Sequence, residues 1–152
     1  MNSTAKISKA TKPSFEIPAS GMDTHTGEQP LGRGRDELRL RTKNYALEAI
    51  GICQALPPTM EAQILSEGLL RAAVAVGAIY REACRAKTDT EFLAKLDLTL
   101  SALDETAYWL ELIEGSGLMR ASEFQGLPQE TVELTAIFMT IVRKIKQRPV
   151  LS

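Results

Sequence analysis

The sequence of 152 residues is poor in the side chains that metal sites and most catalytic centres use. It contains one histidine, His25, and two cysteines, Cys53 and Cys84. Two cysteines cannot form a dense disulfide framework or a four-cysteine zinc site, and so few cysteines fit a reducing cytoplasm. Without a Glu-x-x-His pair the chain also cannot supply a ferritin-like two-metal site. We therefore expect no cofactor, no metal and no enzymatic activity.

Long hydrophobic runs and an excess of one charge are also absent. The longest uncharged apolar runs, Ala72–Tyr80 and Leu134–Val142, have nine residues each, whereas a membrane span needs about 18. Lys6, Lys9 and Lys12 are followed by no apolar segment, so a secretory signal is not expected. The 18 Lys and Arg against 19 Asp and Glu give no overall bias toward nucleic acid. We expect a cytoplasmic protein that does not bind membranes.

The composition of the chain changes near residue 35. Residues 1–35 are rich in Gly, Pro, Ser and Thr, and their few large apolar residues follow no period. Such a segment cannot bury enough surface to offset its ordering entropy, so it predicts a flexible N-terminal tail. A solvated extension and a tether that orders on a partner are both consistent with this tail. Residues 36–148 form the predicted folded domain, and 149–152 form its C-terminal end.

From residue 36 onward, apolar side chains recur every three or four positions, which predicts helices. Thr59 suits an N-cap, and Thr88 with Glu91 three residues later reads as a capping box. Pro128 suits a first helical position. No segment reads as a strand. The predicted helices cover residues 36–56, 60–86, 89–114 and 128–147, with a short turn at 122–125.

Short connections between the first three predicted helices force antiparallel neighbours. The sequence therefore predicts an all-α fold, an antiparallel up-down-up-down four-helix bundle.

The second predicted helix is too apolar for an isolated bundle. Between Leu69 and Tyr80 its one charged residue is Arg71, although a bundle helix normally keeps a polar face. Gly77 costs about 1 kcal/mol in helix propensity, which indicates a packing reason for it. We favour a homo-oligomer; a monomer in which this helix is the most buried one is the alternative. The predicted interface residues are Arg71, Ala73, Val76, Gly77 and Tyr80.

The same helix carries a resemblance to a known family. Residues 70–83 look like the central helix of the bacterial four-helix bundle proteins first noticed in intervening sequences of 23S ribosomal RNA genes. The resemblance covers about residues 36–147. It departs at Ala75, where the family often has Ser or Thr, and at Ile79, where it often has Asn. Other matching stretches are Arg41–Ala46, Ala55–Ala62, Glu91-Phe92, Lys95-Leu96, Asp104–Thr106, Trp109–Leu112 and Gly117-Leu118.

The resemblance implies a homopentamer of up-down-up-down bundles. A similar protein is the accessory subunit of diversity-generating retroelements, a pentameric barrel that binds nucleic acid and a reverse transcriptase. By analogy the partners of this chain are further copies of itself, RNA or DNA, and a reverse transcriptase. A shared fold alone does not fix a function.

Charge is unevenly distributed along the predicted bundle. An antiparallel arrangement brings the start of the first and third helices together with the end of the second and fourth, and cations outnumber acids there. Such an end can hold phosphates by counterion release. Solvated helix ends, where Lys and Arg favour helix C-termini, give the same pattern. The predicted nucleic-acid-binding residues are Arg39, Arg41, Lys43, Arg81, Arg85, Lys87, Lys95, Arg143, Lys144 and Lys146.

Two aromatic side chains, Tyr108 and Trp109, favour core or interface anchors over stacking platforms for bases. We predict a non-enzymatic, oligomeric nucleic-acid-binding accessory protein. The alternative is a protein–protein assembly scaffold that does not bind nucleic acid.

Overall fold

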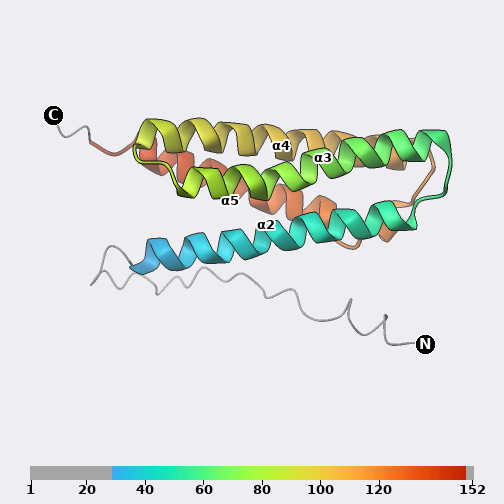
Figure 1. Cartoon of the computed structure of the whole chain (residues 1–152), viewed down its shortest axis with the longest axis horizontal. Helices are drawn as coiled ribbons and strands as arrows, with labels where there is room; N and C mark the ends of the chain where they lie inside the picture. The colour runs from blue at the N-terminus through green and yellow to red at the C-terminus, as the bar shows by residue number, and fades with distance from the viewer. Residues whose placement is uncertain (1–28, 150–152) are drawn as a thin grey trace. The chain divides into compact units, whose positions relative to one another are not determined.

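The computed structural model describes residues 29–149 of the chain, and the regular secondary structure of this part is all helical (Figure 1). No strand occurs among these residues, so the predicted all-α class is confirmed for them. The chain divides into two units, Met1–Glu37 and Leu38–Ser152, and the packing described below belongs to the second. The elements are α2 (Gln29–Ala55), α3 (Met60–Cys84), α4 (Asp89–Gly115), the short 3-10 helix η1 (Ala121–Phe124) and α5 (Leu127–Lys146).

Local capping chemistry sets most of the helix ends. The Thr59 hydroxyl accepts the Ala62 N–H at the start of α3, and the Thr88 hydroxyl accepts the Glu91 N–H at the start of α4. These side chains satisfy amide groups that have no partner inside the helix. At the start of α5, Gly126 has a φ of 89°, which glycine adopts at little cost. The predicted caps of α3 and α4 are therefore confirmed.

The start of the first helix differs from the prediction. Residues 29–35, part of the predicted flexible tail, form the first turns of α2. Pro30 lies in the first turn, where a missing N–H costs no hydrogen bond. The remainder of the predicted tail, residues 1–28, lies outside the described residues.

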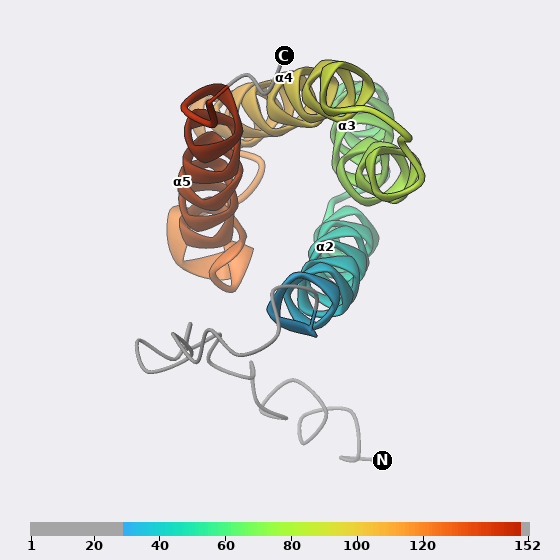
Figure 2. The same cartoon turned by 90° about the vertical axis from the view of Figure 1, so that its left-hand side faces the viewer.

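Contacts between neighbouring helices establish how their residues align. Gly77 of α3 faces Thr42 of α2, and the Cys53 thiol of α2 donates to the Ser66 carbonyl of α3 at 3.7 Å. As the number of the α2 residue rises, the number of its neighbour in α3 falls. Figure 2, the end-on view, shows the helices following one another in the order α2, α3, α4, α5.

The hydrophobic core fills the space between the helices. Tyr45, Tyr80 and Phe138 are fully buried, and the rings of Tyr80 and Phe138 lie 5.2 Å apart. A buried aromatic pair of this kind stabilises packing beyond its buried area. Further core residues come from every helix, among them Leu69, Val76, Leu96, Leu103, Ile113, Leu127 and Leu134.

One described helix, α3, is long and apolar enough to cross a membrane by length and composition. The expectation from uncharged runs missed it, because that count ended at Arg71. About a third of its most apolar window is buried within the fold, 33%. A helix in the core of a folded domain passes the same length and composition test, so this result alone does not assign α3 to a membrane.

Candidate nucleic-acid interface

The ends of α3 and α5 and the start of α4 meet at one end of the bundle. Lys95 of α4 forms an ion pair with Glu82 of α3 at 2.7 Å. Arg148, just after α5, lies 3.5 Å from Asp89 in the first turn of α4. These contacts bring together helix ends that are far apart in the sequence.

Six cations are exposed at this end. Four of them lie in the last turns of α3 and α5, and the helix macrodipole favours positive charge there. None of the six forms an ion pair within the part of the chain that the structure describes. Two nearby acids, Glu82 and Asp89, already pair with other cations. We call this set the basic end: Arg81, Arg85, Lys87, Arg143, Lys144 and Lys146.

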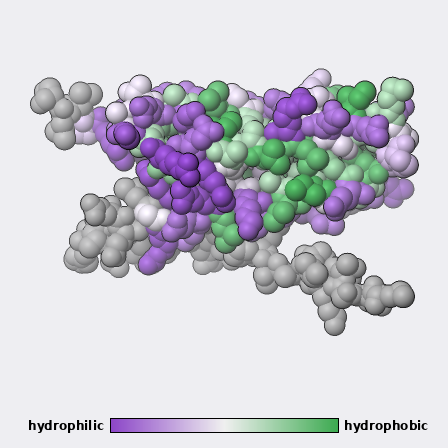
Figure 3. All heavy atoms as spheres, viewed as in Figure 1, coloured by the Kyte–Doolittle hydropathy of each residue, from purple (hydrophilic) through white to green (hydrophobic). Residues whose placement is uncertain are grey.

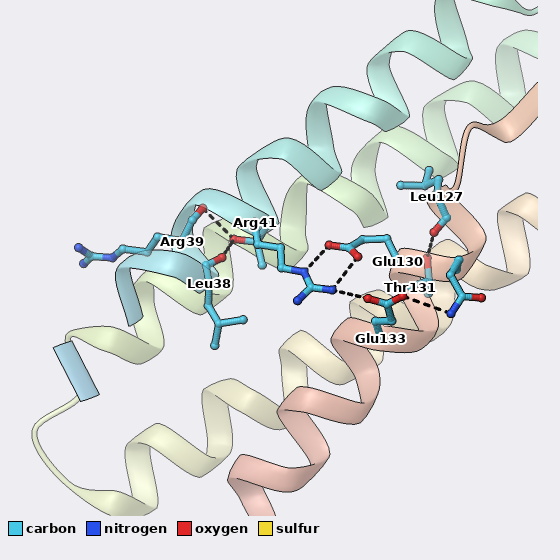
Figure 4. A network of polar contacts seen from close by, with 9 residues as sticks. Leu38, Arg39, Arg41, Leu127, Glu130, Thr131 and Glu133 are labelled. Carbon is cyan, nitrogen blue, oxygen red and sulfur yellow. Dashed lines mark hydrogen bonds and ion pairs between the residues drawn. The ribbon is translucent and has the colours of Figure 1, made fainter. Parts of the chain in front are cut away.

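Arg41 does not belong to the basic end, which corrects the prediction. Its Nε and Nη2 atoms donate to the two carboxylate oxygens of Glu130 at 2.6 and 2.9 Å, and Nη2 also donates to Glu133 at 2.6 Å (Figure 4). The hydrogen bonds to Glu130 raise the pKa of Arg41 above its usual value. Glu130 and Glu133 lie in the first turns of α5, so Arg41 joins α2 to the start of that helix.

The other predicted cations of α2 and α4 fall into separate classes. Lys43 is exposed on α2. Lys95 is half-buried and its charge is matched by Glu82. Arg39 is half-buried, and Figure 4 shows its side chain directed away from Glu130. Arg39 and Lys95 therefore add no fully exposed cation to the six of the basic end.

The predicted interface residues lie mostly inside one chain. Ala73, Val76 and Tyr80 are fully buried among the helices, so their side chains offer no surface to a second copy. A Cβ on Gly77 would lie 3.2 Å from the Thr42 hydroxyl, so this glycine lets α2 approach α3 within the chain. Arg71 is exposed. The small residues of α3 therefore serve contacts within the chain, which corrects the interface prediction for Ala73, Val76 and Tyr80.

A different face of α3 exposes large apolar side chains on either side of two exposed charged residues, Glu67 and Arg71. Met60, Ile64 and Val74 are 74, 58 and 44% exposed. Met60, Ile64, Val74 and Ala78 follow one another at intervals of four, ten and four residues. Each interval is close to a whole number of helical turns, so the four side chains lie on one side of the helix. Figure 3 shows hydrophobic surface along this part of the molecule and hydrophilic surface toward the α3–α4 connection. The sequence prediction missed this face because it followed the small residues of α3 and not its large ones.

Two neighbouring aromatic side chains, the exposed Tyr108 and the partly buried Trp109, lie away from the basic end. The indole of Trp109 in α4 packs on Gly68, in the N-terminal half of α3, and its Nε1 donates to Glu105 at 3.1 Å. Tyr108 beside it is 55% exposed, and its ring centroid lies 5.8 Å from that of Trp109. Asp104 and Glu111 are exposed on the same stretch of α4. This surface is therefore aromatic and acidic.

Two cysteines and no histidine occur in the described residues. No cluster of three or more His, Cys, Asp or Glu side chains that could hold a metal occurs among them. Cys53 is partly buried, and burial raises the pKa of its thiol, which lowers the thiolate fraction and hence its reactivity. His25 lies outside the described residues.

Comparisons with known proteins agree on the family and fold. The family model of the 23S rRNA-intervening sequence protein matches residues 38–140. A crystal structure of a protein with unknown function from the S23 ribosomal protein family, from Bacteroides thetaiotaomicron, superposes with a TM-score of 0.67 and 22% identity. That match covers 72% of this chain and 97% of the other. No match was found among curated proteins.

Proposed function

Because the chain belongs to the 23S rRNA-intervening sequence protein family, we propose that it is a non-enzymatic, oligomeric nucleic-acid-binding accessory protein. Its fold in this proposal is an up-down-up-down bundle that assembles as a homopentamer. A reverse transcriptase is the proposed protein partner, by analogy with the accessory subunit of diversity-generating retroelements.

The observation that carries the proposal is the basic end. Its six cations are exposed and come from two helix ends held together by the buried Tyr80–Phe138 pair. Glu82 and Asp89 are paired with Lys95 and Arg148, and Glu91, whose carboxylate accepts the Lys87 backbone N–H at 3.0 Å, leaves one nearby negative charge against these six cations. Phosphates bound there would release condensed counterions, which gives affinity without sequence readout. In a ring of copies with aligned axes, each copy would add a further six cations to one rim.

The salt dependence of binding tests this function. We expect the protein to bind a labelled oligonucleotide at low salt, with an affinity that falls steeply as salt rises. Replacing Arg85 and Arg143 with Gln should weaken binding to every sequence and reduce the salt slope by about 1 for each phosphate that is no longer neutralised. Arg120→Gln, at an exposed position outside the basic end and outside the proposed interface, provides the control and is compared with Arg85→Gln alone. No binding by the wild-type protein at low salt would refute the function.

The exposed face of α3 supports the oligomeric part of the proposal. An isolated chain leaves Met60, Ile64 and Val74 in water, although most of the free energy of folding comes from burying such side chains. We place the interface between copies on this face, together with Arg71 and Ala78, in place of the buried small residues.

The alternative function is a protein–protein assembly scaffold without nucleic-acid binding. It rests on the same exposed face of α3, which suits contacts between proteins whether or not nucleic acid binds. A stable oligomer that shows no salt-dependent binding to an oligonucleotide would support the scaffold and not the accessory protein.

A further inference from the structure

We propose that the basic end recognises the phosphate backbone of double-stranded nucleic acid and not single strands. This inference rests on the proposed nucleic-acid function and names the class of nucleic acid that the same surface would bind. It follows from where the structure places cations and aromatic rings.

Among residues 29–149, every aromatic ring near the basic end is buried. Tyr80 precedes Arg81 directly, yet its side chain is fully buried against Phe138. Phe92, in the first turns of α4, is also buried. Proteins that bind single strands without sequence preference combine a cationic groove with aromatic rings on which bases stack. The basic end supplies the cations without the rings.

The described rings that reach the surface, the exposed Tyr108 and the partly buried Trp109, lie where phosphates are repelled. Tyr108 and Trp109 are adjacent on α4, and Glu105 accepts a hydrogen bond from the Trp109 indole. Asp104 and Glu111 add two exposed negative charges to the same stretch. A strand that stacked its bases on these rings would bring its phosphates against three carboxylates. The two components of a single-strand site are therefore separated along the bundle.

A duplex needs no stacking partner on the protein. It carries one negative charge per about 1.7 Å of its axis, and each neutralised phosphate releases more counterion than on a single strand. Exposed Arg and Lys side chains alone can therefore bind it, with affinity that depends on charge and salt. The surface matches this chemistry for an RNA or a DNA duplex.

Fluorescence anisotropy with a labelled duplex and with one of its own strands tests the inference. At low salt we expect the duplex to bind at least about tenfold more tightly, with the steeper salt dependence. Equal or tighter binding of the single strand would overturn the inference and leave the proposed function intact. Binding of neither form would instead refute the proposed function.

Trp109 supplies a second readout because it is the sole tryptophan of the chain. Saturation with duplex should leave its emission unchanged, since the basic end is distant from it along α4. Quenching of Trp109 by either nucleic acid would overturn the inference. The variant Tyr108→Ala should retain wild-type affinity for the duplex, because this exposed ring contacts no nucleic acid. A several-fold weaker affinity in that variant would place the binding surface on α4 and contradict the proposal.

Discussion

Arg41 of α2 and Glu130 of α5 form a two-pronged ion pair in which both side chains are 14% exposed. The guanidinium plane matches the carboxylate, and Glu133 accepts a further hydrogen bond from the same Nη2. The pair links the middle of the first helix to the first turn of the last one. Because little water reaches it, salt screens it less than an exposed pair.

Removing the guanidinium should destabilise the protein. We expect Arg41→Met to lower the free energy of unfolding by about 2–3 kcal/mol, because Glu130 is left nearly buried without its partner. Arg41→Lys should cost about 1–2 kcal/mol, because an ammonium cannot make the two-pronged contact. Urea unfolding at fixed protein concentration measures both. Lys43→Met, exposed on the same helix, is the control and should change stability by less than about 0.5 kcal/mol. Wild-type stability in Arg41→Met would contradict this role.

Gly68 and Trp109 provide a second prediction. A Cβ on Gly68 would lie 2.6 Å from Cδ2 of the indole and closer to two other ring atoms. Gly68→Ala should therefore lower stability by about 1–3 kcal/mol, despite a gain of about 1 kcal/mol in helix propensity. The displaced indole should meet more water, so the emission of this sole tryptophan should shift to the red.

Gly51 is the matched control for that substitution. It lies in the interior of α2, is exposed, and an added Cβ meets nothing within 4 Å. Gly51→Ala should stabilise the protein by up to about 1 kcal/mol. If Gly68→Ala stabilised the protein as much as Gly51→Ala does, the indole would not constrain that position.

The helix ends were predictable where one side chain decides them. Thr59 and Thr88 each cap a helix through a hydroxyl three residues before the bonded amide, which is a local pattern. Pro128 marks the first turn of α5 in the same way. The start of α2 was not predictable, because Pro30 and the glycines after it resemble a linker although the chain there is helical.

The candidate site was predictable only in part, because its residues depend on alignment between helices. The cations at the ends of α3 and α5 follow from the helix boundaries alone. Arg41 does not, because a helix that begins at Gln29 places it mid-way along α2 and within reach of Glu130. The sequence contained one indication of this contact. Glu130 and Glu133 lie one turn apart, and no cation close to them in the sequence could pair with them.

The contacts of α3 show a second feature that could not be predicted from the sequence. Ala73 and Val76 are small or medium apolar residues that would suit either a core or an interface, and composition cannot separate these roles. Only the directions of the neighbouring helices decide that they face inward, while Val74 between them faces water.

Tyr45 predicts how stability changes in alkaline solution. The Thr131 hydroxyl donates a hydrogen bond to the Leu127 carbonyl. In its 2.6 Å contact with Tyr45 the Thr131 oxygen is therefore the acceptor, and the Tyr45 hydroxyl is the donor. Burial, the largest cause, raises the pKa of Tyr45 from 10.0 to about 12. Below pH 10 the group is protonated in both states. As pH rises from about 10 to about 12 the unfolded chain ionises first, so stability should fall by about 2–3 kcal/mol.

Two phenylalanine variants isolate this titration. Tyr45→Phe should be less stable by about 1 kcal/mol near neutral pH, because a buried hydrogen bond is removed, but its stability should decline less above pH 10. Tyr108→Phe, which changes an exposed ring, should keep the wild-type slope. An equal alkaline slope in Tyr45→Phe and the wild type would show that Tyr45 does not cause it.

The position of the assembly interface is the last prediction. Ile64 and Val74 are large, exposed and on one side of α3, so we expect Ile64→Lys and Val74→Lys to reduce the oligomer mass measured by light scattering. Helicity should persist, because neither side chain belongs to the core of its own chain. Val132→Lys places the same charge on an exposed apolar position of α5 and should leave the mass unchanged. Ala73→Leu should instead lower stability by about 1–3 kcal/mol, because it overpacks the core. A wild-type monomer at micromolar concentration would refute the assembly, and a Val132→Lys monomer would move the interface to α5.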